Sequence, residues 1–334
     1  MSAEFSRRRF LGVGVAGGIA GALGGASQIA GAESAGAPAG SATGSELPRR
    51  KLGKTGVEVT VLGLGTAPMG EGPPRLEDCV RVYSEAIDLG ISYVDTARIY
   101  GKAEDALGEV LRPRRDKVFL ATKCMVDDAA KAQESFEESL RRMRVDHVDL
   151  LHLHSCGDRD LDKVLAAGGV WDYFKKMKEQ GKTRFIGITG HNRPKKFIRM
   201  LETGQVDVMM VAMNFADRYT YGFEGTVLPV ALKHGTGVMA MKVYGGIRGG
   251  FAYIRQRRPS QLDEIHLQNA VRYGLSIEGV TGLVIGVHDL EELRQNIAFV
   301  SGFTPLSAKE KAGLERLGQR LATEWGPRWG PVEA

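Results

Sequence analysis

Short apolar stretches alternate with longer segments of helical periodicity along most of this 334-residue chain, and no other feature limits its possible folds so strongly. A strand that is followed each time by a helix or a helix-like loop is typical of an all-parallel sheet. Eight such units favour a closed (β/α)8 barrel, the TIM-barrel architecture, over an open sheet. We expect the strands at residues 60–64, 91–95, 117–123, 148–154, 183–189, 206–214, 237–243 and 280–287.

Further elements are expected between the strands and at both ends of the barrel. Two short alternating runs flank Lys54-Thr55-Gly56, which predicts a β-hairpin before the first strand. Amphipathic patterns at 75–90, 127–144 and 171–182 predict helices, and we expect one more helix at the C-terminus. The barrel domain is expected to cover residues 48–334.

The N-terminal segment has the pattern of a targeting signal. SRRRFLG (6–12) precedes a weakly apolar run, and Ala30-Gly31-Ala32 matches an A-x-A cleavage site. The segment resembles a twin-arginine export signal, which implies transport to the periplasm or beyond by the twin-arginine machinery. We therefore expect a signal peptide at 1–32 and a flexible linker at 33–47, with no stable membrane anchor. A retained anchor and a cytosolic protein are the alternatives.

Composition argues against nucleic acid as a partner. Hydrophobic residues make up 43% of the chain and charged residues 25%, which is ordinary for a globular protein. The formal net charge is +5, and part of this surplus comes from the arginines of the N-terminal segment. The arginine clusters at 112–115 and 255–259 are interpreted as solvated loop charges, with phosphate binding as the alternative.

Cysteines and histidines give no convincing metal-binding pattern. Cys79, Cys124 and Cys156 are scattered, so we expect free buried thiols, with a Cys124–Cys156 disulfide as the alternative. His152 and His154 would share one face of a strand, but no suitable third ligand stands out. We therefore expect no metal, and interpret His152 as a hydrogen-bonded residue of the barrel interior.

Ionisable residues stand at the ends of successive expected strands. In a (β/α)8 barrel the carboxyl ends of the strands converge on one mouth, where the chemistry takes place. Asp95, Lys123 and His154 end three successive strands, and Tyr100 follows Asp95 on its loop. The sequence therefore predicts a four-residue catalytic site at the mouth.

These four side chains suit the reduction of a carbonyl group. An isolated tyrosine titrates near 10, and a neighbouring ammonium is expected to lower that pKa. Asp95 would keep Lys123 charged and in place, and His154 could hydrogen-bond a substrate carbonyl. Tyr100 would then donate a proton to the developing alkoxide.

The same motifs resemble the aldo-keto reductase family over nearly all of residues 48–324. RKLGKTGVEVTVLGLGT is similar to the family's opening hairpin and first strand, and VDTARIYG resembles its D-T-A-x-x-Y-G signature. ATK and DLLHLHS place the family's lysine at Lys123 and its histidine at His154. In that family the four residues act as argued above, on hydride from a nicotinamide cofactor that lies extended across the barrel mouth without a Rossmann fold.

The resemblance also implies which residues bind the cofactor, and it favours NADP(H) over NAD(H). Thr189-Gly190-His191 replaces the usual Ser-Asn pair, Met210 replaces a common glutamine, and Glu292 stands where some members have an arginine. The implied cofactor-binding residues are Gly65, Thr66, Thr189, Gly190, His191, Asn214, Met241, Lys242, Gly286, Val287, His288 and Asn296.

The expected activity is an NAD(P)H-dependent oxidoreductase that converts an aldehyde, ketone or sugar-like carbonyl to the alcohol, or the reverse. The substrate pocket is expected to include Arg98, Ser155, Arg218 and Tyr244. A cofactor-sensing regulatory module on the same fold is the alternative, although an intact set of four favours the enzyme. The sequence does not predict the substrate or the physiological direction.

Overall fold

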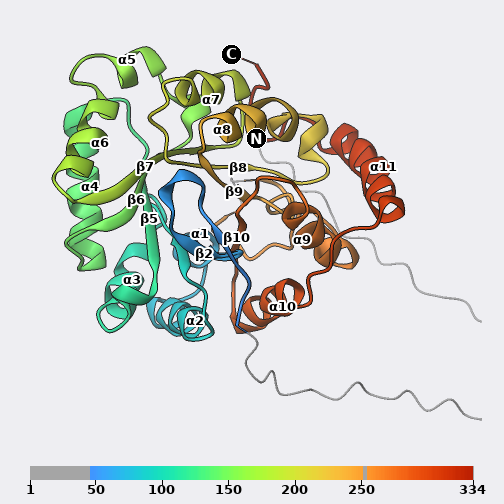
Figure 1. The fold of residues 1–334 in the computed structure, drawn as a ribbon. Coiled ribbons are helices and arrows are strands. Elements are labelled where there is room, and N and C mark those ends of the chain that lie inside the picture. The colour runs from blue at the N-terminus through green and yellow to red at the C-terminus, as the bar shows by residue number, and fades with distance from the viewer. Residues whose placement is uncertain (1–45, 251–253, 334) are drawn as a thin grey trace, which may run out of the picture. The chain divides into compact units, whose positions relative to one another are not determined.

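Eight parallel strands close into a barrel in the order β10-β3-β4-β5-β6-β7-β8-β9, and helices surround it (Figure 1). The computed structural model describes residues 46–250 and 254–333. The closed parallel barrel confirms the predicted (β/α)8 fold. Its strands are β3 (Leu62–Gly65), β4 (Tyr93–Asp95), β5 (Phe119–Cys124), β6 (Val148–Leu153), β7 (Thr183–Gly190), β8 (Val208–Ala212), β9 (Gly237–Met241) and β10 (Gly282–Gly286).

The helices follow the amphipathic segments of the sequence. The helices expected at 75–90, 127–144 and 171–182 are α2, α4 and α6, and the expected C-terminal helix is α11. Ser307 and Glu310 form a capping box that fixes where α11 begins. The helices are α1 (Ala67–Glu71), α2 (Leu76–Asp88), α3 (Ala103–Leu111), α4 (Ala129–Met143), α5 (Leu161–Leu165), α6 (Val170–Glu179), α7 (Pro194–Leu201), α8 (Leu228–Lys233), α9 (Leu267–Leu275), α10 (Leu290–Ser301) and α11 (Ala308–Trp325).

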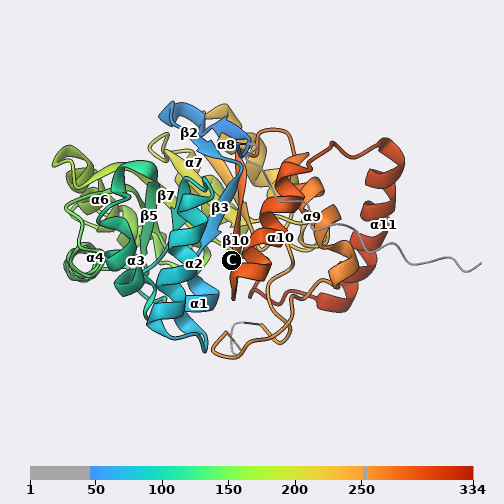
Figure 2. The ribbon, with the colours of Figure 1, turned by 90° about the horizontal axis from the view of Figure 1, so that it is seen from below.

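The predicted hairpin closes one end of the barrel. Its strands β1 (Arg49–Lys51) and β2 (Glu58–Thr60) pair antiparallel. At the turn, a Cβ atom on Gly53 would lie only 2.3 Å from the backbone nitrogen of Gly237, so this close approach to the start of β9 requires glycine. Figure 2 shows the hairpin at the opposite end of the barrel from the loop that follows β9. The open mouth therefore lies where the strands end.

Apolar side chains fill the closed end of the barrel. Tyr93 and Phe119 stack with ring centroids 5.4 Å apart, and Phe119 and Phe185 stack at 6.0 Å. Leu52 and Val59 of the hairpin segment pack against this group from below. A second, larger cluster lies between the barrel and its helices. The interior is thus a packed core at one end, which leaves only the mouth for chemistry.

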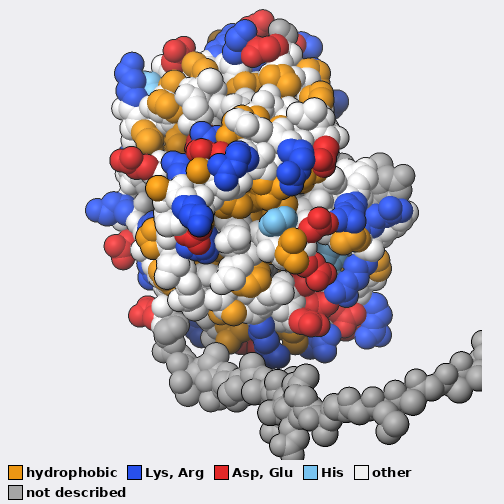
Figure 3. Space-filling view, turned by 90° about the vertical axis from the view of Figure 1, so that its right-hand side faces the viewer, with side chains coloured by type: hydrophobic (Ala, Val, Ile, Leu, Met, Phe, Trp, Pro, Cys, Tyr) orange, Lys and Arg blue, Asp and Glu red, His pale blue; other side chains and the backbone are white. Residues whose placement is uncertain are grey.

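The remaining sequence predictions concern the N-terminal segment, a membrane anchor, nucleic-acid binding and the cysteines. The predicted signal peptide at 1–32 and nearly all of the predicted linker at 33–47 lie outside the described residues. None of the described helices is long and apolar enough to cross a membrane. On the face shown in Figure 3, basic and acidic side chains are intermixed rather than gathered into one basic surface. All three cysteines are buried and free, as expected from their spacing.

Candidate active site

The barrel mouth is polar because the inward-facing positions change character along each strand. Successive side chains of a strand point to opposite faces, so every second residue faces inward. On β5 the inward series runs Phe119, Ala121 and Lys123, and on β4 it runs from Tyr93 to Asp95. Asp95 is in register with Ala121, one inward position below Lys123. The backbone thus places a carboxylate and an ammonium side by side at the mouth.

The structure brings the four predicted catalytic residues together. The Lys123 Nζ atom donates to Asp95 Oδ2 at 2.6 Å, to the Thr96 carbonyl oxygen at 2.7 Å and to the Tyr100 hydroxyl at 3.3 Å. The His154 ring meets the Tyr100 ring edge-on, with centroids 5.8 Å apart. Asp95, Lys123 and His154 are 3%, 1% and 5% exposed. Their mutual geometry is therefore set by buried contacts rather than by flexible surface side chains.

The expected lowering of the Tyr100 pKa is wrong. Burial raises the pKa of Tyr100 well above its ordinary value, and the nearby carboxylates of Asp95 and Glu71 raise it further. The physical reason is that Lys123 is paired with Asp95, so the positive charge near the phenol is largely balanced. Tyr100 therefore remains a protonated phenol across the neutral range.

Burial also sets the protonation of the neighbouring groups. Burial lowers the pKa of His154 well below its usual value, and the positive charge of Lys123 lowers it further. The imidazole is therefore neutral at pH 7 and keeps one N–H group. Burial likewise lowers the pKa of Lys123, but Asp95 opposes this effect through its charge and hydrogen bond. The pair holds a charge deep in the barrel that neither residue would keep alone.

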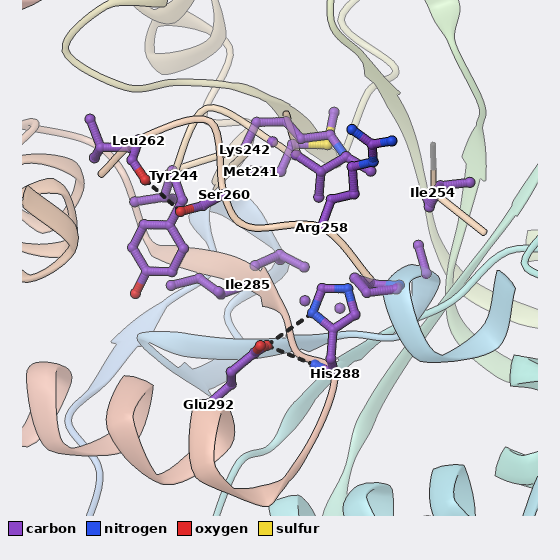
Figure 4. A pocket seen from close by; sticks show the side chains of 18 of the residues that line it. Met241, Lys242, Tyr244, Ile254, Arg258, Ser260, Leu262, Ile285, His288 and Glu292 are labelled. Atoms are coloured by element: carbon purple, nitrogen blue, oxygen red, sulfur yellow. Dashed lines mark hydrogen bonds and ion pairs between the residues drawn. The ribbon is translucent and has the colours of Figure 1, made fainter. Parts of the chain in front are cut away.

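A cavity of ≈ 640 Å³ opens beside these residues. It extends from Asp95 and Tyr100 to the loops that follow β9 and β10. In Figure 4, Lys242 and Arg258 lie across this cavity from His288 and Glu292. Phosphate groups commonly bind at the loops after the seventh and eighth strands of such barrels, which here are β9 and β10. The cavity therefore joins the four-residue cluster to a position suited to an anionic group.

More than half of the predicted cofactor-binding residues line this cavity. The residues in its wall are Gly65, Thr66, Met241, Lys242, Gly286, His288 and Asn296. The others, which do not line it, are Thr189, Gly190, His191, Asn214 and Val287.

One buried atom supports a polar ligand near β7. The Thr189 side chain is 1% exposed, and its Oγ1 atom has no hydrogen-bond partner among the described residues. A buried hydroxyl without a partner is costly, so a ligand group that bonds it would be stabilised. Because Thr189 does not line the cavity, its contact with a cofactor stays a prediction.

The predicted substrate-pocket residues are less well placed. Only Tyr244 lines the cavity, and its hydroxyl donates to Asn296 Oδ1 at 2.6 Å. Arg98 donates to the buried carboxylate of Glu104 at 2.5 Å. Ser155 and Arg218 also lie outside the cavity wall. Substrate contact by Arg98, Ser155 and Arg218 stays a prediction. Ser155 approaches the Met125 sulfur at 4.0 Å, and Arg218 donates to the Tyr273 hydroxyl at 2.9 Å.

Among the residues near the mouth that sequence reasoning missed, Trp329 and Glu71 bear most on the site. Trp329 lines the cavity although it lies far along the chain from every strand end. Glu71, at the end of α1, is close enough to raise the pKa of Tyr100. The segment WGPRWG (325–330) carries two tryptophans and an arginine among glycines and prolines, a signal that could have drawn attention to the tail. No comparable signal marks Glu71.

Comparisons with known proteins identify the family of the chain. The model of the aldo/keto reductase family matches residues 61–318. The chain belongs to this family. It is similar to the L-galactose dehydrogenase of Arabidopsis thaliana, with 28% identity over 300 residues that cover 80% of this chain and 92% of the plant protein. It is also 27% identical over 325 residues to the pyridoxal 4-dehydrogenase of Microbacterium luteolum, covering 77% of this chain and 94% of that protein.

A solved relative shows the same architecture. An aldo/keto reductase from Klebsiella pneumoniae, determined in complex with NADP and acetate, matches with a TM-score of 0.64 and 25% identity. The match covers 82% of this chain and 96% of that one. The family and these relatives identify the chain as an NAD(P)-dependent oxidoreductase.

Proposed function

We propose that this aldo-keto reductase reduces an aldehyde, ketone or sugar-like carbonyl to the alcohol, or runs the reverse reaction, with Tyr100 as the proton donor. The observation that carries the proposal is the set of contacts from Lys123 Nζ to Asp95 and to the Tyr100 hydroxyl. The relatives that act on L-galactose and pyridoxal support a carbonyl or alcohol substrate of modest size.

Each residue has a role that follows from its contacts. When bound, the nicotinamide cofactor supplies or accepts the hydride. Lys123 donates to the Tyr100 oxygen at 3.3 Å, so the phenol hydrogen is not used in that bond and can point to a substrate oxygen. The raised pKa of Tyr100 keeps that hydrogen in place at neutral pH, so the residue is in the protonated form that the reducing direction requires. Neutral His154 donates a second hydrogen bond to the carbonyl oxygen.

Asp95 acts through Lys123. It balances the ammonium charge and fixes the Nζ atom at 2.6 Å, while the Thr96 carbonyl accepts a further hydrogen bond. Both contacts hold the lysine under Tyr100 before substrate arrives. This preorganisation spares the reorganisation that solvated groups would need.

We propose NADP(H) as the preferred cofactor, with Lys242, Thr189 and Asn214 near its nicotinamide end and His288 and Asn296 near its adenosine end. The NADP complex of the Klebsiella pneumoniae relative supports this choice. Lys242 and Arg258 supply positive charge in the cavity wall, which suits phosphate groups.

The direct test is a screen of purified protein for nicotinamide oxidation with a carbonyl panel, together with fluorescence titration of NADPH and NADH. We expect saturable binding of at least one cofactor and turnover of at least one carbonyl. Failure of both cofactors to bind at about millimolar concentration, the upper end of the ordinary range of Michaelis constants, would contradict the proposed function.

We also propose export by the twin-arginine pathway, on the basis of SRRRFLG and Ala30-Gly31-Ala32. Replacing Arg7 and Arg8 together with lysine keeps the charge but removes both guanidinium groups. We expect this variant to stay in the cytoplasm as uncleaved precursor, whereas the wild-type chain is exported and begins near Glu33. Cell fractionation and intact mass of the product measure both outcomes. An equal periplasmic yield from the two proteins would contradict this route.

A further inference from the structure

A lysine two residues after Tyr100 binds the end of the short helix α1. The Lys102 Nζ atom donates to three backbone carbonyl oxygens there, those of Met69 at 3.2 Å, Gly70 at 3.0 Å and Gly72 at 2.9 Å. The last carbonyl groups of a helix have no partner within the helix, and a lysine side chain is one of the groups that supply it. The three contacts match the three N–H groups of an ammonium. Lys102 therefore holds α1 against the loop after β4.

Backbone contacts join the same two segments. The Lys102 amide donates to the Gly70 carbonyl at 3.1 Å. A Cβ atom on Gly70 would lie 2.4 Å from the carbonyl oxygen of Tyr100, so only glycine allows α1 to approach the loop this closely. Glu71, the last residue of α1, is near enough for its charge to raise the pKa of Tyr100. The end of α1 and the loop that carries Tyr100 thus form one packed unit.

The start of α1 is fixed beside another member of the catalytic group. Thr66, the residue before α1, donates to the Asp95 carbonyl through its amide at 3.1 Å and through its Oγ1 atom at 2.9 Å. The Tyr83 hydroxyl donates to the Thr66 carbonyl at 3.0 Å, and Thr66 and Tyr83 are both buried. Helix α1 is therefore attached at its start to Asp95 and at its end to the loop of Tyr100.

The Tyr100 loop has a separate attachment on its other side. Arg98, two residues before Tyr100, donates to Glu104 of α3 at 2.5 Å. Glu104 is 1% exposed and accepts from the Thr122 Oγ1 atom of β5 at 2.9 Å. This contact does not involve α1 or Lys102. Loss of the Lys102 contacts should therefore shift the loop without releasing it.

We propose that Lys102 is a positioning residue, which holds the loop against α1 so that the Tyr100 hydroxyl stays within reach of Lys123 and of the substrate oxygen. Lys102 does not line the cavity, so it acts through Tyr100 rather than by touching substrate or cofactor. The contact of 3.3 Å between Lys123 Nζ and the Tyr100 hydroxyl is already longer than most hydrogen bonds, so a small shift of the loop breaks it. This inference rests on the proposed function, with Tyr100 as the proton donor.

The first test removes the ammonium. Lys102→Met keeps most of the apolar stem but loses all three contacts to α1. We expect the single-turnover rate of carbonyl reduction to fall roughly 10–100-fold, because a displacement of about 1 Å at a reacting group has an effect of this order. The dissociation constant of the cofactor and the KM of the substrate should stay within about twofold of wild type. Lys102→Arg keeps the charge and several N–H donors and should retain most of the rate.

Lys54 offers a matched control. Its Nζ atom also donates to a backbone carbonyl, that of Gly204 at 3.1 Å, but it belongs to the hairpin at the closed end of the barrel. Lys54→Met removes a contact of the same kind far from the mouth and should leave the single-turnover rate within about twofold of wild type. Thermal unfolding of every variant shows whether its fold is intact.

A double-mutant cycle shows whether Lys102 acts through Tyr100. In a Tyr100→Phe background the proton donor is already lost, so adding Lys102→Met should lower the remaining rate by less than about threefold. A merely structural role would give the same loss in both backgrounds. If Lys102→Met does not fold, Lys102→Gln, which also loses the charge, takes its place in the cycle with the same expected result.

The outcomes separate this inference from the proposed function. An unchanged single-turnover rate in Lys102→Met would overturn the inference alone, as would a loss confined to KM. A full further loss in the Tyr100→Phe background would overturn it as well, because Lys102 would then act independently of Tyr100. A wild-type protein inactive on every carbonyl with both cofactors, or a Tyr100→Phe variant as active as wild type, would overturn the proposed function and the inference with it.

Discussion

The two walls of the central cavity are built by different means. On the side of β4 and β5, Asp95 and Lys123 are 3% and 1% exposed, and each is fixed by short hydrogen bonds. On the side of α10, Glu292 and Arg257 meet at 3.4 Å with side chains 36% and 59% exposed. A buried pair is expensive to break, whereas an exposed pair contributes little. We call the side of β4 and β5 the buried wall and the side of α10 the exposed wall. Substitutions in the buried wall should therefore slow the chemical step, and those in the exposed wall should only change the preference between NADPH and NADH.

The largest effect is expected at Tyr100. Tyr100→Phe removes one oxygen and little volume, so folding and cofactor binding should survive. The chemical step should slow by about 10²–10⁴, the usual contribution of a positioned acid. Single-turnover reduction measures this step separately from product release.

A control variant shows whether the loss of activity in Tyr100→Phe is specific to the active site. Tyr219 is 40% exposed and lies outside the cavity wall, so Tyr219→Phe should keep nearly all turnover. If Tyr100→Phe keeps more than about half of wild-type turnover, it lacks the loss expected of a general acid. His154 would then be the leading candidate for the donor.

The buried wall could largely be predicted from the sequence, because its geometry is local to each strand. Asp95, Lys123 and His154 are strand-end residues, and alternation along a strand decides which face each one occupies. The protonation of Tyr100 could not be predicted, because it depends on how far the phenol is buried and on the pairing of Lys123 with Asp95. A neighbouring lysine alone suggests the opposite shift.

Contacts between residues that lie far apart in the chain could not be predicted from the sequence pattern. Trp329 reaches a loop residue 137 positions earlier in the chain, and nothing in local periodicity indicates that pairing. Arg98 was expected at the substrate but donates to Glu104, a carboxylate that is buried within α3. Tertiary packing determines these contacts, and neither the hydrophobic periodicity of the sequence nor its short motifs indicate them.

A second, intermediate effect should appear in the pH dependence of cofactor binding. Burial and the charge of Lys123 lower the pKa of Lys242 to about 8. Its ammonium is therefore present below about pH 8 and is lost as the pH rises through that value. We expect the dissociation constant of NADPH to rise by roughly tenfold between pH 7 and pH 9.5, because one charge near the cofactor disappears.

Two variants of Lys242 show whether this residue is responsible. Lys242→Met should bind NADPH more weakly at pH 7 and show little further change up to pH 9.5. Lys242→Arg keeps its charge throughout this range and should also give a flat profile, but with tighter binding. A wild-type profile that persists in Lys242→Met would mean that another group titrates.

The smallest effect is expected in the exposed wall, at Glu292. Although burial opposes it, hydrogen bonding by His288 holds the pKa of Glu292 below its usual value, so the carboxylate is ionised at neutral pH. This negative charge lies in the cavity wall next to His288, which we propose near the adenosine end, so it would disfavour the extra phosphate of NADPH. Glu292→Gln keeps the shape and removes the charge. Because an exposed charge is screened, the ratio of kcat/KM for NADPH to that for NADH should rise only about two- to fivefold.

Glu291→Gln removes the same charge from the preceding position of α10, outside the cavity wall, and should leave this ratio unchanged. Equal shifts in the two variants would indicate a general charge effect rather than one that belongs to the cavity wall.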